Sequence, residues 1–167
     1  MQNYEELFEK LNAKIWDYAE LKFEEYQSSE ALIDMMKAHG FSVERGLAGM
    51  DTAFRATAGK GRPVIGLLAE YDALSGLSQK AGQLEAIPRK GTENGHGCGH
   101  CLLGTAAAGA ALMAKDYLIQ TGREGTVVLI GCPAEEGGSG KAYLARLACL
   151  MIWTQRSPGI QLEETLF

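Results

Sequence analysis

The sequence has little that would suit a nucleic-acid partner, a membrane or a disulfide-stabilised fold. Its net charge is −5 and it lacks a Lys/Arg cluster, which argues against nucleic acid as the main partner. No apolar run reaches the ~18 residues of a membrane helix, and the start, MQNYEELFEK, is acidic rather than signal-like. Three of the four cysteines lie outside any disulfide-scaffold spacing. We therefore expect a cytoplasmic protein that binds neither nucleic acid nor membrane.

The 167 residues suffice for one domain with a substantial core. Apolar spacing predicts two amphipathic helices in the first forty residues, with Ser28 or Ser29 capping the second and Gly40 ending it. The runs PVIGLLA (63–69) and GTVVLIGC (125–132) are continuously apolar, as central strands buried on both faces are. Further predicted elements are strands at 41–45 and 52–57, a small-residue-rich helix at 101–118 and a short helix at 141–147. This order predicts an α/β domain, a layered mixed sheet flanked by helices.

Three polar clusters adjoin predicted strand ends, where α/β folds place ligands. They are Glu70-Tyr71-Asp72, the segment His96-Gly-Cys98-Gly-His100-Cys101, and Glu135-Glu136. Asp72 is equally consistent with a turn former or helix cap. The segment Gly137–Lys141 imitates part of a phosphate loop, but the neighbouring carboxylates would repel a phosphate, so we reject nucleotide binding.

The histidine and cysteine cluster is the most specific of the three. Imidazole and thiolate suit borderline transition metals, and the spacing of Cys98 and His100 predicts that both act from a loop. Three other interpretations stay open: a glycine-rich turn, a structural zinc site using Cys98, Cys101 and Cys132, and thiol–disulfide exchange through Cys98-Gly-His-Cys101. Glu135-Glu136 follows a buried strand, and of two adjacent carboxylates one can bind a metal while the other holds the water that it activates.

Long stretches of the sequence resemble a known family. The segments AEYDALSGL (69–77), ENGHGCGHCLLGTAA (93–107) and GTVVLIGCPAEEGGSGKAYLAR (125–146) are similar to the aminoacylase/carboxypeptidase family of metallopeptidases, peptidase family M20. The likeness is greatest to its amidohydrolase branch, which includes hydrolases of aminobenzoyl-glutamate, and it covers about residues 4–147.

The resemblance implies a metal-dependent amidohydrolase with two divalent ions, zinc or manganese, that hydrolyses amide bonds of N-acyl amino acids, aminobenzoyl-glutamate or dipeptides. By the same likeness, Cys98, His100 and Glu136 are metal ligands. Glu135 is the catalytic general base, and Asp72 orients or approaches the metal site. Where the family has Asp or Asn after Cys-Gly-His, this chain has Cys101, a thiol that would compete for metal or oxidise with Cys98.

The family's pattern also predicts that this chain is an incomplete catalytic domain. The chain has no histidine after His100, whereas the family supplies two more metal-binding histidines later, the second after a dimerisation domain. We expect residues 1–147 to form the N-terminal part of the catalytic domain, and 148–167 to be a non-family tail from a shifted reading frame. On this interpretation the dimerisation domain and its homo-oligomer are missing, and the chain is inactive alone. A non-catalytic fragment is the remaining alternative.

Overall fold

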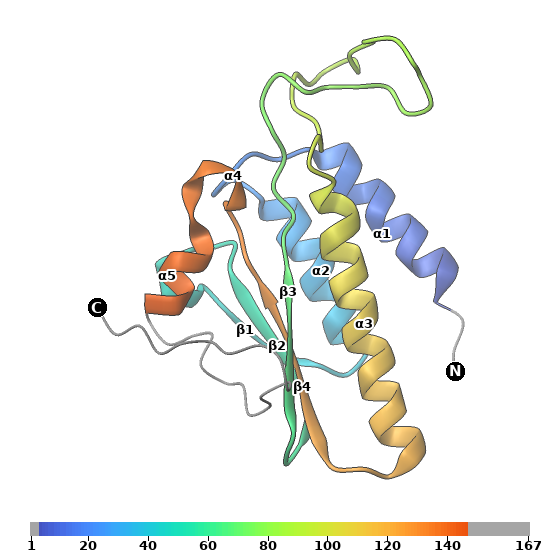
Figure 1. The fold of residues 1–167 in the computed structure, drawn as a ribbon, viewed down its shortest axis with the longest axis vertical. Coiled ribbons are helices and arrows are strands. Elements are labelled where there is room, and N and C mark those ends of the chain that lie inside the picture. The colour runs from blue at the N-terminus through green and yellow to red at the C-terminus, as the bar shows by residue number, and fades with distance from the viewer. Residues whose placement is uncertain (1–3, 147–167) are drawn as a thin grey trace, which may run out of the picture.

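The computed structural model describes residues 4–146 and shows a four-stranded mixed sheet with helices on both faces (Figure 1). Its helices are α1 (Glu5–Tyr18), α2 (Tyr26–Ala38), the 3-10 helix η1 (Leu47–Gly49), α3 (His100–Thr121), α4 (Glu135–Gly138) and α5 (Gly140–Arg146). Its strands are β1 (Ser42–Arg45), β2 (Phe54–Lys60), β3 (Val64–Ala69) and β4 (Gly125–Gly131). The predicted fold class, and the helices and strands expected from the apolar pattern, are confirmed.

The strands lie in the order β1-β2-β4-β3, with β3 and β4 parallel and the other pairs antiparallel. Strand β4 is therefore central and buried on both faces, as predicted: Val127 and Leu129 face one apolar cluster, Val128 and Ile130 the other. The expectation that the PVIGLLA strand is also central is wrong within the described residues. There β3 is an edge strand, and Ile65 is 40% exposed, because β4 inserts between β2 and β3.

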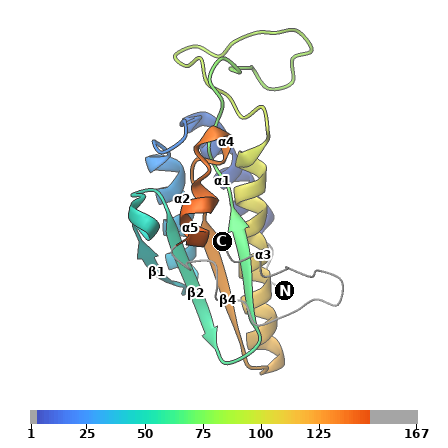
Figure 2. The same cartoon turned by 60° about the vertical axis from the view of Figure 1, so that its left-hand side comes forward.

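The two faces of the sheet carry unequal layers. Helices α1, α2 and α3 cover one face, while α5 lies over the other and buries Leu144 there (Figures 1 and 2). By length and composition α3 alone among the described helices would suffice to cross a membrane, a weak criterion that core helices also meet. Here α3 packs against β3, β4 and α1.

The second helix begins earlier than its serines predict. It starts at Tyr26 after Glu25, which places Ser28 and Ser29 inside α2, so neither is its cap. The first-turn N–H groups of Gln27 and Ser28 instead donate to the Glu20 carboxylate, at 2.9 and 2.8 Å. A carboxylate from the preceding segment thus does the capping, since the N–H groups of a helix's first turn need acceptors from outside the helix.

Between β3 and α3 the chain makes a long excursion away from the body of the domain (Figures 1 and 2). Both its ends are held: the Ala73 amide donates to the Glu20 carbonyl oxygen, and Leu74 and Gly95 exchange backbone hydrogen bonds. The excursion therefore leaves and rejoins the fold at the same edge of the sheet, which fixes Glu70–Asp72 beside the start of α3.

Candidate metal centre

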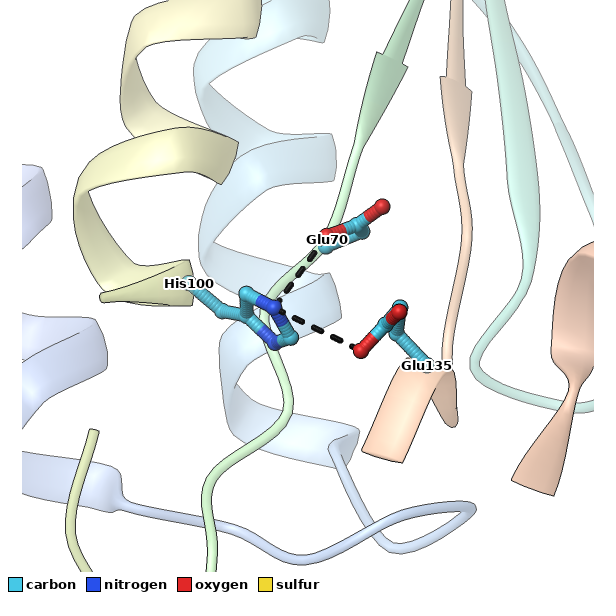
Figure 3. A group of neighbouring side chains, drawn as sticks. All are labelled: Glu70, His100 and Glu135. Carbon is cyan, nitrogen blue, oxygen red and sulfur yellow. Dashed lines mark ion pairs between the residues drawn. The ribbon is translucent and has the colours of Figure 1, made fainter. Parts of the chain in front are cut away.

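Three polar segments meet at one edge of the sheet because β3 and β4 are parallel. Ala69 is in register with Gly131, and the Cys132 amide extends the ladder by donating to the Ala69 carbonyl oxygen at 2.7 Å. The residues after each strand therefore emerge side by side, as ligand-binding residues do in α/β sheets. The N-terminus of α3 reaches the same place, bringing His100 between Glu70 and Glu135 (Figure 3).

His100 is buried and its ring is oriented by Asp72. Its Nδ1–H donates to Asp72 Oδ1 at 2.8 Å, and Asp72 is 1% exposed. This hydrogen bond is the main reason why the pKa of His100 is raised. Burial alone would raise the pKa of Asp72, but the bonds from His100 and the Glu136 amide lower it. Asp72 is therefore an anion that fixes the tautomer and direction of the imidazole, as carboxylates do behind metal-binding histidines.

The other nitrogen of His100 faces two carboxylates. Nε2 lies 3.2 Å from Glu70 Oε2 and 3.7 Å from Glu135 Oε2 (Figure 3). One donor atom from each of these three residues lies within 4.8 Å of the others, the spacing of a group that could hold one metal ion. Nitrogen and carboxylate oxygen donors suit zinc and similar divalent ions.

Glu136 and Cys98 form a second pair of donors beside this group. The Glu136 amide donates to Asp72 Oδ2 at 2.8 Å, so Asp72 holds both His100 and the backbone of the Glu135–Gly138 turn. Glu136 Oε1 is buried without a hydrogen-bond partner, an arrangement that a bound cation would satisfy. The neighbouring Glu136 carboxylate raises the pKa of the exposed Cys98 thiol. The donor set of the site therefore fits divalent metal.

The spacing of Cys98 and His100 predicts that both lie on a loop, but the structure places only Cys98 there. Cys98 lies in the loop before α3, whereas His100 is the first residue of the helix, after Gly99 in the left-handed conformation. Of the five predicted site residues, the structure joins His100 with Asp72 and Glu135, and Glu136 with Asp72 and Cys98.

Two further residues belong to the site: Glu70, which stood in a predicted polar cluster without an assigned role, and Lys141, which was not predicted. Glu70 is mostly buried, and its second oxygen pairs with the Lys141 ammonium, which projects from α5. A sequence signal for Glu70 existed: it directly follows the apolar strand and stands two residues before Asp72. Lys141 gave no such signal, because only the packing of α5 brings it to Glu70.

Cys101 does not contact the site. It is 2% exposed and belongs to the apolar cluster under α1–α3, so the expected competition with the metal ligands is wrong. Cys132 lies in the cluster on the opposite face of the sheet, which rules out a zinc site shared by Cys98, Cys101 and Cys132. Burial raises the pKa of Cys101, and that of Cys98 is raised too, whereas thiol–disulfide exchange needs lowered values.

The imidazole and the carboxylates thus converge at the carboxyl edge of the sheet, where α/β folds place ligands. The sequence profile of peptidase family M20/M25/M40 matches residues 66–161, past Leu147, where the resemblance was expected to end. This chain therefore belongs to peptidase family M20/M25/M40. Residues 147–167, with the predicted tail and frame break, lie outside the described residues.

Two curated relatives illustrate the likeness in sequence. The chain is 52% identical over 133 residues to a p-aminobenzoyl-glutamate hydrolase polypeptide of Escherichia coli (strain K12), covering 80% of this chain and 28% of that protein. It is 32% identical over 151 residues to Xaa-Arg dipeptidase of Homo sapiens, covering 80% of this chain and 30% of the relative. The chain thus spans less than a third of the length of these relatives.

Solved structures share the fold. The Bacillus subtilis YXEP protein, described as a dinuclear metal-binding peptidase, superimposes with a TM-score of 0.69 at 21% identity, covering 87% of this chain and 41% of that one. An aminobenzoyl-glutamate utilization protein from Klebsiella pneumoniae gives a TM-score of 0.56 at 17% identity, covering 85% and 40%. At these identities the likeness concerns the fold alone.

Proposed function

We propose that this chain forms the metal-binding part of an amidohydrolase catalytic domain. The observation that carries the proposal is the arrangement around His100. Asp72 occupies Nδ1, while the carboxylates of Glu70 and Glu135 approach Nε2. Three acceptor groups around one imidazole call for a cation to neutralise them.

Each residue has a distinct role in this proposal. His100, Glu136 and Cys98 are metal ligands, as the family likeness implies, and the position of Glu70 adds a fourth. Asp72 is the positioning residue that keeps Nε2 of His100 directed at the ion. Glu135, the most exposed of the four carboxylates, is the general base.

A bound divalent ion polarises the scissile carbonyl and lowers the pKa of water, so that a carboxylate can deprotonate it near neutral pH. Glu135 accepts that proton at Oε2 and returns it to the leaving amine. Lys141 neutralises one oxygen of Glu70, which limits the repulsion among the four carboxylates of the site: Glu70, Asp72, Glu135 and Glu136.

For the substrate we propose an N-acyl amino acid or dipeptide of the aminobenzoyl-glutamate type, supported by the 52% identity to the Escherichia coli hydrolase. We further propose that the 167-residue chain does not hydrolyse it alone. Of its three histidines only His100 belongs to the group of donor atoms that could hold a metal ion. We also propose that the whole protein is cytoplasmic and forms a homo-oligomer.

Isothermal titration of the purified chain with Co²⁺, Mn²⁺ and Zn²⁺, its thiols kept reduced, tests the metal centre. We expect saturable binding in the wild type, a loss of at least tenfold in His100→Ala, and no change in the matched control His39→Ala. Absence of saturable binding, or equal affinity in wild type and His100→Ala, would contradict the proposal. In a full-length protein, Glu135→Gln should still bind metal but lose roughly 10²–10⁴ in turnover.

A further inference from the structure

Glu25 is a buried carboxylate that lies behind the candidate metal centre rather than in it. It directly precedes α2, and its exposed fraction is 0%. Each of its oxygens accepts a hydrogen bond: the Ala134 amide donates to Oε1 at 2.7 Å, and the Thr52 hydroxyl donates to Oε2 at 2.9 Å. A buried carboxylate is costly unless it is hydrogen-bonded, and here both oxygens are satisfied by segments distant in the sequence.

The Ala134 bond matters because of the backbone at that residue. Ala134 has φ 57° and ψ 43°, the left-handed conformation that residues with a Cβ avoid, and it directly precedes Glu135. Such a conformation persists only where the surroundings hold it. Two hydrogen bonds do so here: the Ala134 amide donates to Glu25, and the Gly140 amide donates to the Ala134 carbonyl oxygen at 3.2 Å.

The same network reaches the other carboxylate segment of the site. The Tyr71 hydroxyl donates to the Thr52 carbonyl oxygen at 2.6 Å, and Tyr71 stands between Glu70 and Asp72. Through Thr52, Glu25 is therefore connected to both strand ends that present site residues.

We propose that Glu25 is a positioning residue that holds the left-handed turn at Ala134, and thereby directs the Glu135 carboxylate toward His100 and the Glu136 amide toward Asp72. This inference rests on the proposed metal centre for its functional meaning. The hydrogen bonds to Ala134 and Thr52 stand independently of it.

Glu20 offers a matched control. It lies five residues earlier, and its carboxylate also accepts backbone hydrogen bonds, from Gln27 and Ser28 at the start of α2. Losing it should weaken the helix without touching the turn at Ala134. Comparing Glu20→Ala with Glu25→Ala and Glu25→Gln thus separates general destabilisation from positioning.

The experiment uses the 167-residue chain and two measurements: Co²⁺ affinity by calorimetry, and amide hydrogen exchange at residues 134–136 with no metal present. We expect the Glu25 variants to bind Co²⁺ about 10–100-fold more weakly, the range for residues behind metal ligands, and to exchange faster at 134–136. Glu20→Ala should match the wild type in both. Thr52→Val, which removes one donor to Glu25 and leaves the Tyr71 bond, provides a milder variant if the Glu25 variants do not fold.

The inference would be overturned if Glu25→Gln bound Co²⁺ as tightly as the wild type. It would also be overturned if Glu20→Ala, at the same stability as Glu25→Gln, lost as much Co²⁺ affinity. If the wild type itself binds no Co²⁺, the proposed metal centre fails, and the exchange data alone decide the rest. Faster exchange at 134–136 in Glu25→Gln would then support the positioning role, and unchanged exchange would refute it.

Discussion

Replacing Asp72 with asparagine should weaken metal binding and the fold together. Asp72 accepts hydrogen bonds from His100 Nδ1 and from the Glu136 amide, both at 2.8 Å, and it is almost fully buried. Asparagine keeps one acceptor oxygen, but its NH₂ group must face one of the two donors. The bond to His100 then survives only if Nδ1 becomes the acceptor, which moves the ring proton to Nε2, the nitrogen that faces the candidate ion; otherwise a buried donor is left without a partner.

The size of both effects follows from these bonds. Losing a hydrogen bond to a charged group costs about 1.5–3 kcal/mol, so we expect Asp72→Asn to reduce the free energy of unfolding by that amount at neutral pH. Without the anion that fixes its tautomer, His100 should bind Co²⁺ roughly 10–100-fold more weakly. The pKa of His100 should also fall, because the Asp72 bond is the main cause of its elevation.

The pH dependence of stability provides an independent check. Folding lowers the pKa of Asp72. Its contribution to the free energy of unfolding is therefore complete above the unfolded-state pKa of about 3.9 and is lost as the pH falls through the folded-state pKa. The stability gap between wild type and Asp72→Asn should therefore be widest at neutral pH and close in acid.

Urea unfolding across this pH range, together with calorimetric Co²⁺ titration near neutral pH, measures these effects, with Asp34→Asn on the exposed face of α2 as the control. A gap that stays constant from neutral pH to acid, or an unchanged Co²⁺ affinity, would refute the reasoning.

Three further outcomes are expected. In Gly104→Ala the new Cβ would lie 2.5 Å from the Glu70 carbonyl oxygen, so urea unfolding should show a loss of about 1–3 kcal/mol and calorimetry a weaker Co²⁺ site. Cys101 faces the core, so Cys101→Ser should lower the free energy of unfolding in urea by about 1–3 kcal/mol and leave Co²⁺ affinity unchanged. A tenfold loss of Co²⁺ affinity would contradict this prediction. Burial raises the pKa of Glu25, so the protonated carboxyl is favoured in the folded state. The difference in free energy of unfolding between wild type and Glu25→Gln, measured by urea unfolding, should therefore be most favourable to the wild type in acid and decline as pH rises through the folded pKa. A difference that grows toward neutral pH would contradict this prediction.

Local apolar patterns predicted the elements well, but not their neighbours. GTVVLIGC and PVIGLLA have the same character, yet only the first forms a strand with partners on both sides among the described residues. Strand order depends on which segments pair across the whole chain, and a run of apolar residues carries no information on that. The predicted cap of α2 was wrong for a similar reason. The serines suggested a cap from within the local sequence, whereas the acceptor is the Glu20 carboxylate, outside the helix.

At the candidate site, residue type and spacing located the three segments, and the family resemblance selected five side chains within them. The sequence could not show that Glu70 faces His100, because this depends on how β3 and α3 are packed. It also gave Glu25 no special meaning, since one more glutamate in the acidic segment LKFEEY is ordinary for a solvated surface. Buried polar groups joined across long sequence separations are what local patterns cannot predict.

The hydrogen bond between Glu25 and Ala134 joins residues 109 positions apart. Contacts of such separation form late, because the chain must first lose the entropy of closing a long loop. During synthesis, Glu25 leaves the ribosome before Ala134 does, so this bond can form only after the chain has been made as far as residue 134. We therefore expect substitutions at Glu25 to accelerate unfolding while leaving the folding rate nearly unchanged, which makes this contact a determinant of how long the native state persists.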